Sequence, residues 1–209
     1  MNASAISRRR LIAMACLAPL GGCSSLIPDP PAPAMYRLDP ADLDPAPPQI
    51  RHDSLTIGLP TAPQNLDSDR IALTRGMARF DYYADSTWTD RAPALLQALL
   101  VEAFETDGRI ADVWTDRDSM SDGYLLETAV RAFTARYDSA AASPPVVEVS
   151  LDLRLVRLPG RQTEGRDLID EQCPAARNDL ASVVRAFDVA TGKALNGAVA
   201  WTLRSMRRA

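Results

Sequence analysis

The chain has 209 residues, with 23 Lys or Arg and 27 Asp or Glu, so its formal net charge at pH 7 is −4. This length suits one domain with its own hydrophobic core. An acidic balance without a clustered basic face argues against nucleic-acid binding.

The start of the chain has the order of a secretory signal. Three arginines at residues 8–10 precede an apolar run at 11–20 and then two glycines, and this order of charged, apolar and small residues is typical of export signals. The apolar run is about half as long as a membrane-spanning helix. It ends in Leu20-Gly21-Gly22-Cys23, which resembles the bacterial lipoprotein box. The resemblance implies cleavage between Gly22 and Cys23 and a lipid anchor on the Cys23 thiol, whereas the alternative is a buried structural cysteine after an ordinary signal.

The residues around the signal bear on export route and location. Ser7-Arg8-Arg9 resembles the start of a twin-arginine signal, but arginines are also common in ordinary signals, so both routes stay open. Ser24 follows the cysteine, where Asp usually retains a lipoprotein in the inner membrane. We therefore predict a signal peptide at 1–22 and a lipid-anchored envelope protein, on the outer membrane and facing the periplasm.

Cleavage changes the charge and the cysteine inventory. Removing residues 1–22 from 209 leaves 187, and Lys plus Arg falls from 23 to 20 while Asp plus Glu stays at 27, a balance of about −7. Cys16 leaves with the signal and Cys23 carries lipid, so Cys173 has no internal disulfide partner. We expect Cys173 to be a packed, unreactive thiol.

The first half of the mature chain alternates irregular segments and strands. Residues 23–34 form a proline-rich tether, and a second proline cluster at 45–48 follows a short strand. Expected strands lie at 35–38, 55–59, 70–74 and 77–83, the last two as a hairpin turning at Arg75-Gly76. A helix at about 92–106 follows, with Asp90 as N-cap, Pro93 in the first turn and Gly108 as its stop.

The second half contains the clearest strand, 146–156. Its odd residues from Val147 to Leu155 are apolar and the even residues from Glu148 to Arg154 are polar or charged, so one face meets a core and the other meets water. Further strands are expected at 110–114, 124–133 and 165–173, with a turn at Pro159-Gly160. A final helix spans about 178–204, where Thr191-Gly192 allows a break. Residues 35–209 therefore predict one α+β domain, a mostly antiparallel sheet with two main helices packed on one face.

Residues that could support chemistry are isolated. His52 has no neighbouring histidine, and the remaining thiol lies far along the chain, so a zinc site or a Cys–His nucleophile pair is poorly supported. The loop at 115–123 has three aspartates, but Met120 and Ser121 occupy places where a calcium loop needs an acidic or amide residue and a glycine. Asp170-Glu171 point to opposite strand faces. We predict no catalytic residue, no metal site, no cofactor and no enzymatic activity.

Three aromatic residues allow two interpretations. Tyr82, Tyr83 and Trp88 either pack between the hairpin and the first helix or form part of a partner surface, where Tyr and Trp often supply binding energy.

Several short motifs follow one another along the chain in a particular order. They are Tyr36-Arg37-Leu38, Ile57-Gly58-Leu59-Pro60, the Arg70-Ile71-Ala72 start of the hairpin, Tyr82-Tyr83 with Trp88, a helix ending at Phe104 and Gly108, and Ala186-Phe187-Asp188 with Trp201. Together with the lipoprotein box, their order and spacing resemble the ABC-type transport auxiliary lipoprotein family, the PqiC-like proteins.

The resemblance implies a non-enzymatic subunit of an MCE-type lipid transport system. Such systems pair an inner-membrane permease and ATPase with a periplasmic MCE-domain protein, and the lipoprotein would dock that assembly at the outer membrane. It also implies a homo-oligomeric ring of copies of this chain. The alternatives are a general envelope-assembly or scaffolding lipoprotein and a periplasmic hydrolase. A groove between the sheet and the final helix would favour lipid binding by the domain itself.

Overall fold

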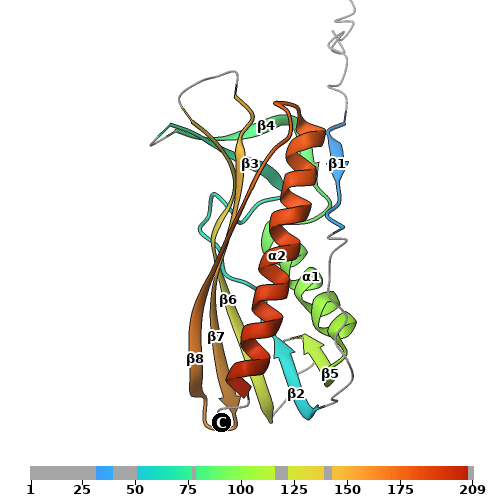
Figure 1. The fold of residues 1–209 in the computed structure, drawn as a ribbon, viewed down its shortest axis with the longest axis vertical. Coiled ribbons are helices and arrows are strands. Elements are labelled where there is room, and N and C mark those ends of the chain that lie inside the picture. The colour runs from blue at the N-terminus through green and yellow to red at the C-terminus, as the bar shows by residue number, and fades with distance from the viewer. Residues whose placement is uncertain (1–31, 40–50, 77–78, 116–121, 139–142, 207–209) are drawn as a thin grey trace, which may run out of the picture. The chain divides into compact units, whose positions relative to one another are not determined.

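The computed structural model describes residues 32–39, 51–76, 79–115, 122–138 and 143–206, which belong to one structural unit, Ala32–Ala209. Two helices accompany a sheet (Figure 1). The helices are α1 (Ala92–Asp107) and α2 (Leu180–Met206). The strands are β1 (Ala34–Tyr36), β2 (Arg51–Ile57), β3 (Arg70–Arg75), β4 (Arg79–Trp88), β5 (Ile110–Thr115), β6 (Gly123–Tyr137), β7 (Val146–Leu158) and β8 (Gln162–Pro174).

The predicted α+β architecture is confirmed, but the sheet is mixed. Its strand order is β1-β4-β3-β6-β2-β5, and β7 and β8 extend it from β6. The pairs β6–β7, β7–β8 and β3–β4 are antiparallel, whereas β1–β4, β2–β5, β2–β6 and β3–β6 are parallel. Alternation along a strand reports which face is buried and carries no information on the direction of its neighbours, which is why the sequence missed the parallel pairs.

Strand β6 organises the sheet because it is longer than the strands beside it. Its start pairs with β2, through Leu55 and Tyr124, and its end pairs with β3, through Leu73 and Ala135. Between them Thr61 bridges to β6 with two backbone hydrogen bonds, from its own N–H to Thr128 O (2.9 Å) and from Val130 N–H to its carbonyl (2.8 Å). One edge of β6 is thus shared by three successive segments.

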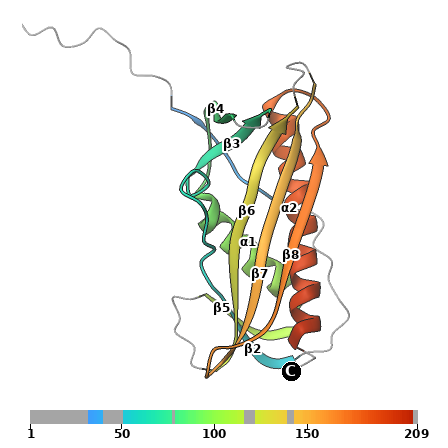
Figure 2. The same cartoon turned by 90° about the vertical axis from the view of Figure 1, so that its left-hand side faces the viewer.

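The long strands β6, β7 and β8 have one covered and one open face. All five predicted core residues of β7 are fully buried, and α2 packs on β7 and β8. Figure 2 looks at the opposite side of these strands, with both helices behind them. We call this side the outer face; it carries the even-numbered β7 residues from Glu148 to Arg154. The predicted placement of two helices on one face is confirmed.

The predicted helix ends and the predicted helix break are only partly correct. Gly108 ends α1 in the left-handed conformation (φ 70°), as predicted. The predicted N-cap Asp90 is wrong: Arg91 occupies that position without a side-chain cap, and Asp90 accepts only from the N–H of Arg91 (2.7 Å). Helix α2 is continuous through Thr191-Gly192, because both residues are buried against the core.

Some expectations shift in position or lie outside the described residues. Strand β2 begins at Arg51, so His52 lies inside a strand rather than before it. Most of the loop at 115–123 is outside the described residues. Neither helix in the described ranges combines the length and the apolar character needed to cross a membrane.

Candidate functional site

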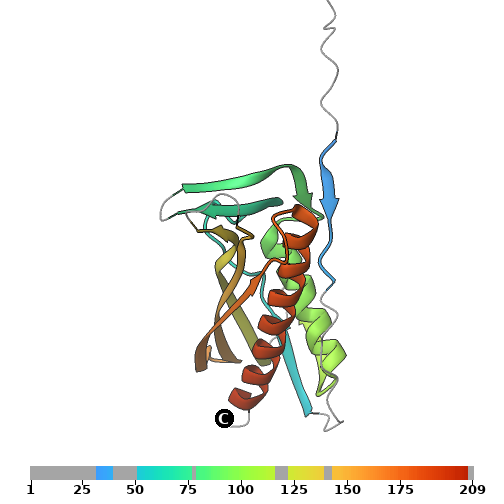
Figure 3. The ribbon, with the colours of Figure 1, turned by 45° about the horizontal axis from the view of Figure 1, so that its top comes forward.

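The predicted lipid anchor precedes the described part of the chain. Cys23, the cleavage position after Gly22 and most of the tether fall within residues 1–31, outside the described residues. The described chain begins at Ala32, just before β1, and Figure 3 shows β1 lying along the end of β4. The register joins Tyr36 to Trp88, so the tether enters the fold as a parallel edge strand.

Two contacts hold the chain after β1 to the body of the fold. Leu38 is only 2% exposed. The next residue, Asp39, donates its backbone N–H to Asp188 Oδ1 on α2 at 3.0 Å. Burial raises the pKa of Asp188 above its ordinary value, and the nearby Asp39 carboxylate acts in the same direction. Asp188 belongs to the Ala186-Phe187-Asp188 motif, and its structural role is to hold the chain after β1.

Of the three predicted partner-contact aromatics, Trp88 belongs to the core. It is 1% exposed and packs against Phe133 and Phe187, with ring centroids 5.7 and 5.1 Å away. Trp88 cannot contact a partner from this position. It is a packed residue, but its ring contacts are with β6 and α2 rather than with the first helix. Burial among rings from β6 and α2 depends on long-range packing that local sequence does not reveal.

Tyr82 and Tyr83 are half-buried on β4 and make different contacts. Tyr82 stacks under the Arg70 guanidinium (3.9 Å to the ring centroid) and donates its hydroxyl to Asn65 O (3.0 Å). The Tyr83 hydroxyl shares a 2.8 Å hydrogen bond with the Tyr137 hydroxyl, and burial with that contact raises the pKa of Tyr83 well above its ordinary value. Both side chains hold the hairpin to its neighbours. That they also contact a partner protein stays a prediction.

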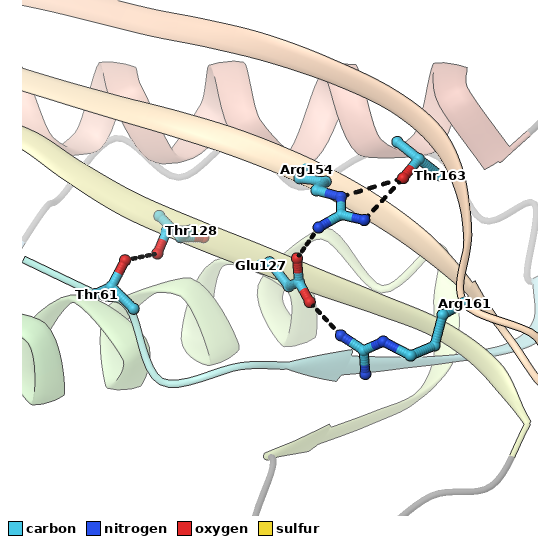
Figure 4. Close-up of polar contacts among 6 residues, drawn as sticks. All are labelled: Thr61, Glu127, Thr128, Arg154, Arg161 and Thr163. Carbon is cyan, nitrogen blue, oxygen red and sulfur yellow. Dashed lines mark hydrogen bonds and ion pairs between the residues drawn. The ribbon is translucent and has the colours of Figure 1, made fainter.

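The outer face carries a ladder of ion pairs. Sequence alternation predicts that these side chains lie on this face, but not which of them contact each other. Arg154 on β7 donates to Glu127 on β6 (3.1 Å) and, through two nitrogens, to Thr163 Oγ1 on β8 (3.1 and 3.0 Å). Arg161 binds the other oxygen of Glu127 at 2.7 Å. Figure 4 shows Arg154 and Arg161 meeting at Glu127, with Thr163 beside Arg154. Asp152 is paired in turn with Arg131.

A pocket of about 420 Å³ opens beside this ladder. We call it the outer-face pocket. Its lining residues are Gly58, Leu59, Thr61, Leu125, Glu127, Thr128, Ala129, Asp152, Arg154 and Arg166. Its lining thus combines apolar residues with four charged ones, Glu127, Asp152, Arg154 and Arg166, and Leu59 remains 51% exposed.

The pocket exists because β2 ends before β6 does. Gly58 still donates to Leu126 O (3.0 Å), and a Cβ at Gly58 would lie 3.3 Å from that oxygen. The chain then diverges to Leu59 and returns at Thr61. Sequence alternation predicted the polar face of β7, but the neighbours of Arg154 follow only from the register of β6 and β8.

Both carboxylates that line this pocket are paired with guanidiniums, Glu127 with Arg154 and Arg161, and Asp152 with Arg131. Within the described ranges, no group of three or more His, Cys, Asp or Glu side chains is arranged to hold a metal ion. Helix α2 packs directly on the sheet: the inner-face residues of β7 from Val147 to Leu155 are fully buried, and a Cβ at Gly165 or Gly197 would lie 3.3–3.4 Å from a side chain across that contact.

Known proteins provide an independent comparison. A protein of Bradyrhizobium diazoefficiens is 30% identical over 151 residues, which is 72% of this chain and 39% of that relative, so the chain spans about two fifths of the relative's length. A crystal structure from Xanthomonas campestris is 26% identical with a TM-score of 0.69, covering 85% of this chain and 96% of that one.

A second solved structure shows the fold alone, with 12% identity, a TM-score of 0.63 and coverage of 81% of this chain and 98% of that one. The family comparison identifies more than the fold. Residues 36–200 match the model of the ABC-type transport auxiliary lipoprotein component. The matched segment runs from β1 to the last turns of α2 and includes the whole outer face. The chain therefore belongs to the ABC-type transport auxiliary lipoprotein family.

Proposed function

We propose that this protein is a non-catalytic docking subunit of an MCE-type lipid transport system, anchored to the outer membrane through Cys23. The observation that carries the proposal is the family match over residues 36–200 directly behind a lipoprotein box at 20–23. An auxiliary component of an ABC-type transporter acts with a permease and an ATPase, and a lipid anchor confines it to a membrane.

The way the tether joins the fold supports a docking role. Cys23 and the first strand are separated by the 10 residues from Ser24 to Pro33, which reach about 31 Å if extended as polyproline. The edge strand β1, buried Leu38 and the Asp39–Asp188 hydrogen bond tie that tether to β4 and α2. A load on the tether is therefore spread over sheet and helix, which suits a subunit that holds a partner near a membrane.

Affinity capture tests the proposal. The full lipidated chain carries a C-terminal tag in its own host, the envelope is solubilised in detergent, and captured proteins are identified by mass spectrometry. We expect an MCE-domain protein with a permease and an ATPase. An equally tagged but unrelated lipoprotein is the control for background.

Recovery of none of these partners with intact, lipidated bait would contradict the docking role and favour a general scaffolding lipoprotein. Separation of inner and outer membranes on a density gradient tests the anchoring site. Residence in the inner membrane would contradict the outer-membrane assignment while leaving the family membership unchanged.

A further inference from the structure

An unfavourable charge arrangement stands out on the outer face. Arg154 on β7 and Arg166 on β8 are Cα partners in the antiparallel ladder, so their side chains leave the sheet side by side. Like charges directly opposite each other destabilise a strand pair. Arg154 is balanced by Glu127 and Thr163, but within the described part of the chain Arg166 has no hydrogen-bond or ion-pair partner.

The surrounding charges leave this arrangement positive. The arginine cluster consists of Arg131, Arg154, Arg161 and Arg166 around two carboxylates, Glu127 and Asp152. Its formal charge is therefore about +2, on a chain whose net charge is −4. Among the described residues, all N–H donors of Arg166 are available to a ligand. Arg161 donates to Glu127 through one nitrogen. A concave site with low-dielectric walls concentrates this field and attracts anions.

Apolar side chains also line the pocket beside these charges. Leu59, Leu125 and Ala129 line it. Leu168, the β8 residue opposite Asp152, is 56% exposed and adds to the apolar surface at the rim. Positive charge beside exposed leucine side chains matches a ligand that is anionic at one end and apolar at the other.

We propose that the outer-face pocket binds a phospholipid with an anionic headgroup, such as phosphatidylglycerol. Its phosphate lies between Arg166 and Arg154, where planar guanidiniums bind phosphate oxygens through paired hydrogen bonds. The glycerol and the first chain carbons lie against Leu59 and Leu125. A volume of about 420 Å³ accommodates a headgroup and part of one chain. The choice of a lipid among phosphate amphiphiles rests on the proposed function.

The same geometry disfavours an extended peptide. Peptides added to a sheet need a strand edge with unpaired backbone groups. Here the edge of β6 is occupied in turn by β2, Thr61 and β3, so the pocket presents side chains rather than a backbone edge.

Calorimetry on the full lipidated chain in uncharged detergent micelles tests the proposal. The probes are dihexanoylphosphatidylglycerol, dihexanoylphosphatidylcholine and the chain-free headgroup glycerophosphoglycerol. We expect phosphatidylglycerol to bind about tenfold more tightly than either other probe. Arg166→Gln is expected to weaken that binding about tenfold, the scale of one charge-assisted contact. Leu59→Ser is expected to weaken binding of the lipid but not of the headgroup.

The control is Arg79→Gln, which removes the same charge from an exposed residue of β4 and is expected to bind phosphatidylglycerol as the unmodified chain does. Thermal unfolding of each variant confirms that it is folded. Equal binding by Arg166→Gln and the unmodified chain overturns the proposal, and so does equal affinity for lipid and chain-free headgroup.

Binding of a Glu-rich peptide that depends on Arg166, without binding of phosphatidylglycerol, would assign the site to a protein partner and overturn the lipid proposal. The measurement needs only the purified chain, so its failure is distinct from failure to capture an MCE-domain protein.

Discussion

At the residue scale, the core depends on three rings that come from three distant elements. Trp88 ends β4, Phe133 lies in β6 and Phe187 lies in α2, with centroids 5.0–5.7 Å apart. The burial of Trp88 has an unfavourable contribution to stability, because its indole N–H is buried without a hydrogen-bond partner among the described residues. The ring is retained for its packing, not for its polar atom.

Trp88→Ala is therefore expected to lower the free energy of unfolding by about 3–5 kcal/mol through the cavity it leaves. Trp88→Phe is expected to cost less than half as much, since most of the ring contact remains and the unpaired N–H is removed. Urea unfolding followed by circular dichroism measures both. Equal losses for the two variants would show that ring packing is not what Trp88 contributes.

Asp179, a half-buried residue, sets the start of α2. Its Oδ1 accepts the backbone N–H of Ser182 at 2.8 Å, one of the donors that the first turn of α2 leaves free. The Arg177 guanidinium, with that N–H, lowers the pKa of Asp179 to about 2. The charged carboxylate is thus favoured in the folded state, so its contribution is present above the unfolded pKa of 3.8 and is lost as pH falls towards 2.

We expect Asp179→Ala to lower the thermal midpoint at pH 7 and Asp179→Asn, which still caps, to lower it less. The gap between the unmodified chain and Asp179→Ala is expected to be constant from pH 7 to about pH 5 and to shrink below pH 4. Thermal unfolding across this pH range measures it. A gap that widened in acid would contradict the role of the charged carboxylate.

At the element scale, β6 pairs in parallel with both β2 and β3. The pairing with β2 requires the first residue of β6, Gly123, to lie very close to β2. Gly123 has φ +89°, and a Cβ there would overlap Ser54 Oγ and lie 2.6 Å from Ser54 O on β2. No other residue type fits both the dihedral angle and the space. Gly123 therefore allows the start of β6 to approach β2 closely.

Gly123→Ala is expected to cost about 3 kcal/mol, from the positive φ together with overpacking. Gly76→Ala is the matched control, because Gly76 also has a positive φ (+59°) but nothing lies within 4 Å of its added Cβ. It is expected to cost only about 1 kcal/mol. Similar losses in chemical unfolding would show that the contact with Ser54 is not limiting.

At the scale of the whole molecule, the proposed anchor and the folded unit are separable. Cys23 is the proposed site of lipid attachment, whereas Cys173, a free cysteine partly buried at the end of β8, belongs to the fold. The proposed domain limits, with a signal at 1–22, a tether at 23–34 and a folded domain at 35–209, follow this division.

Cys23→Ser is expected to abolish palmitate labelling and to leave the signal uncleaved, because a hydroxyl does not replace the thiol as acceptor of the lipid. Cys173→Ser is expected to remain labelled and cleaved. Metabolic labelling with intact-mass spectrometry distinguishes the two. Labelling that persisted in Cys23→Ser would refute the anchor.

The sequence by itself determined the features that depend on neighbours along the chain. Alternation identified the buried face of β7, Gly108 marked the end of α1, Pro159-Gly160 marked the turn into β8, and the ordered motifs indicated the family. Local rules were less reliable where competing contacts exist, as at Asp90, which does not cap α1, and at Thr191-Gly192, where core packing keeps α2 continuous.

Only the tertiary structure decided which strands lie beside β6, that Trp88 is core and that Arg154 faces Arg166 across the ladder. Each of these depends on contacts between residues far apart in sequence. A strand's pattern of apolar residues sets which face is buried, but not which strand pairs with it or in which direction. The outer-face pocket arises from those pairings, and so no motif in the sequence indicates it.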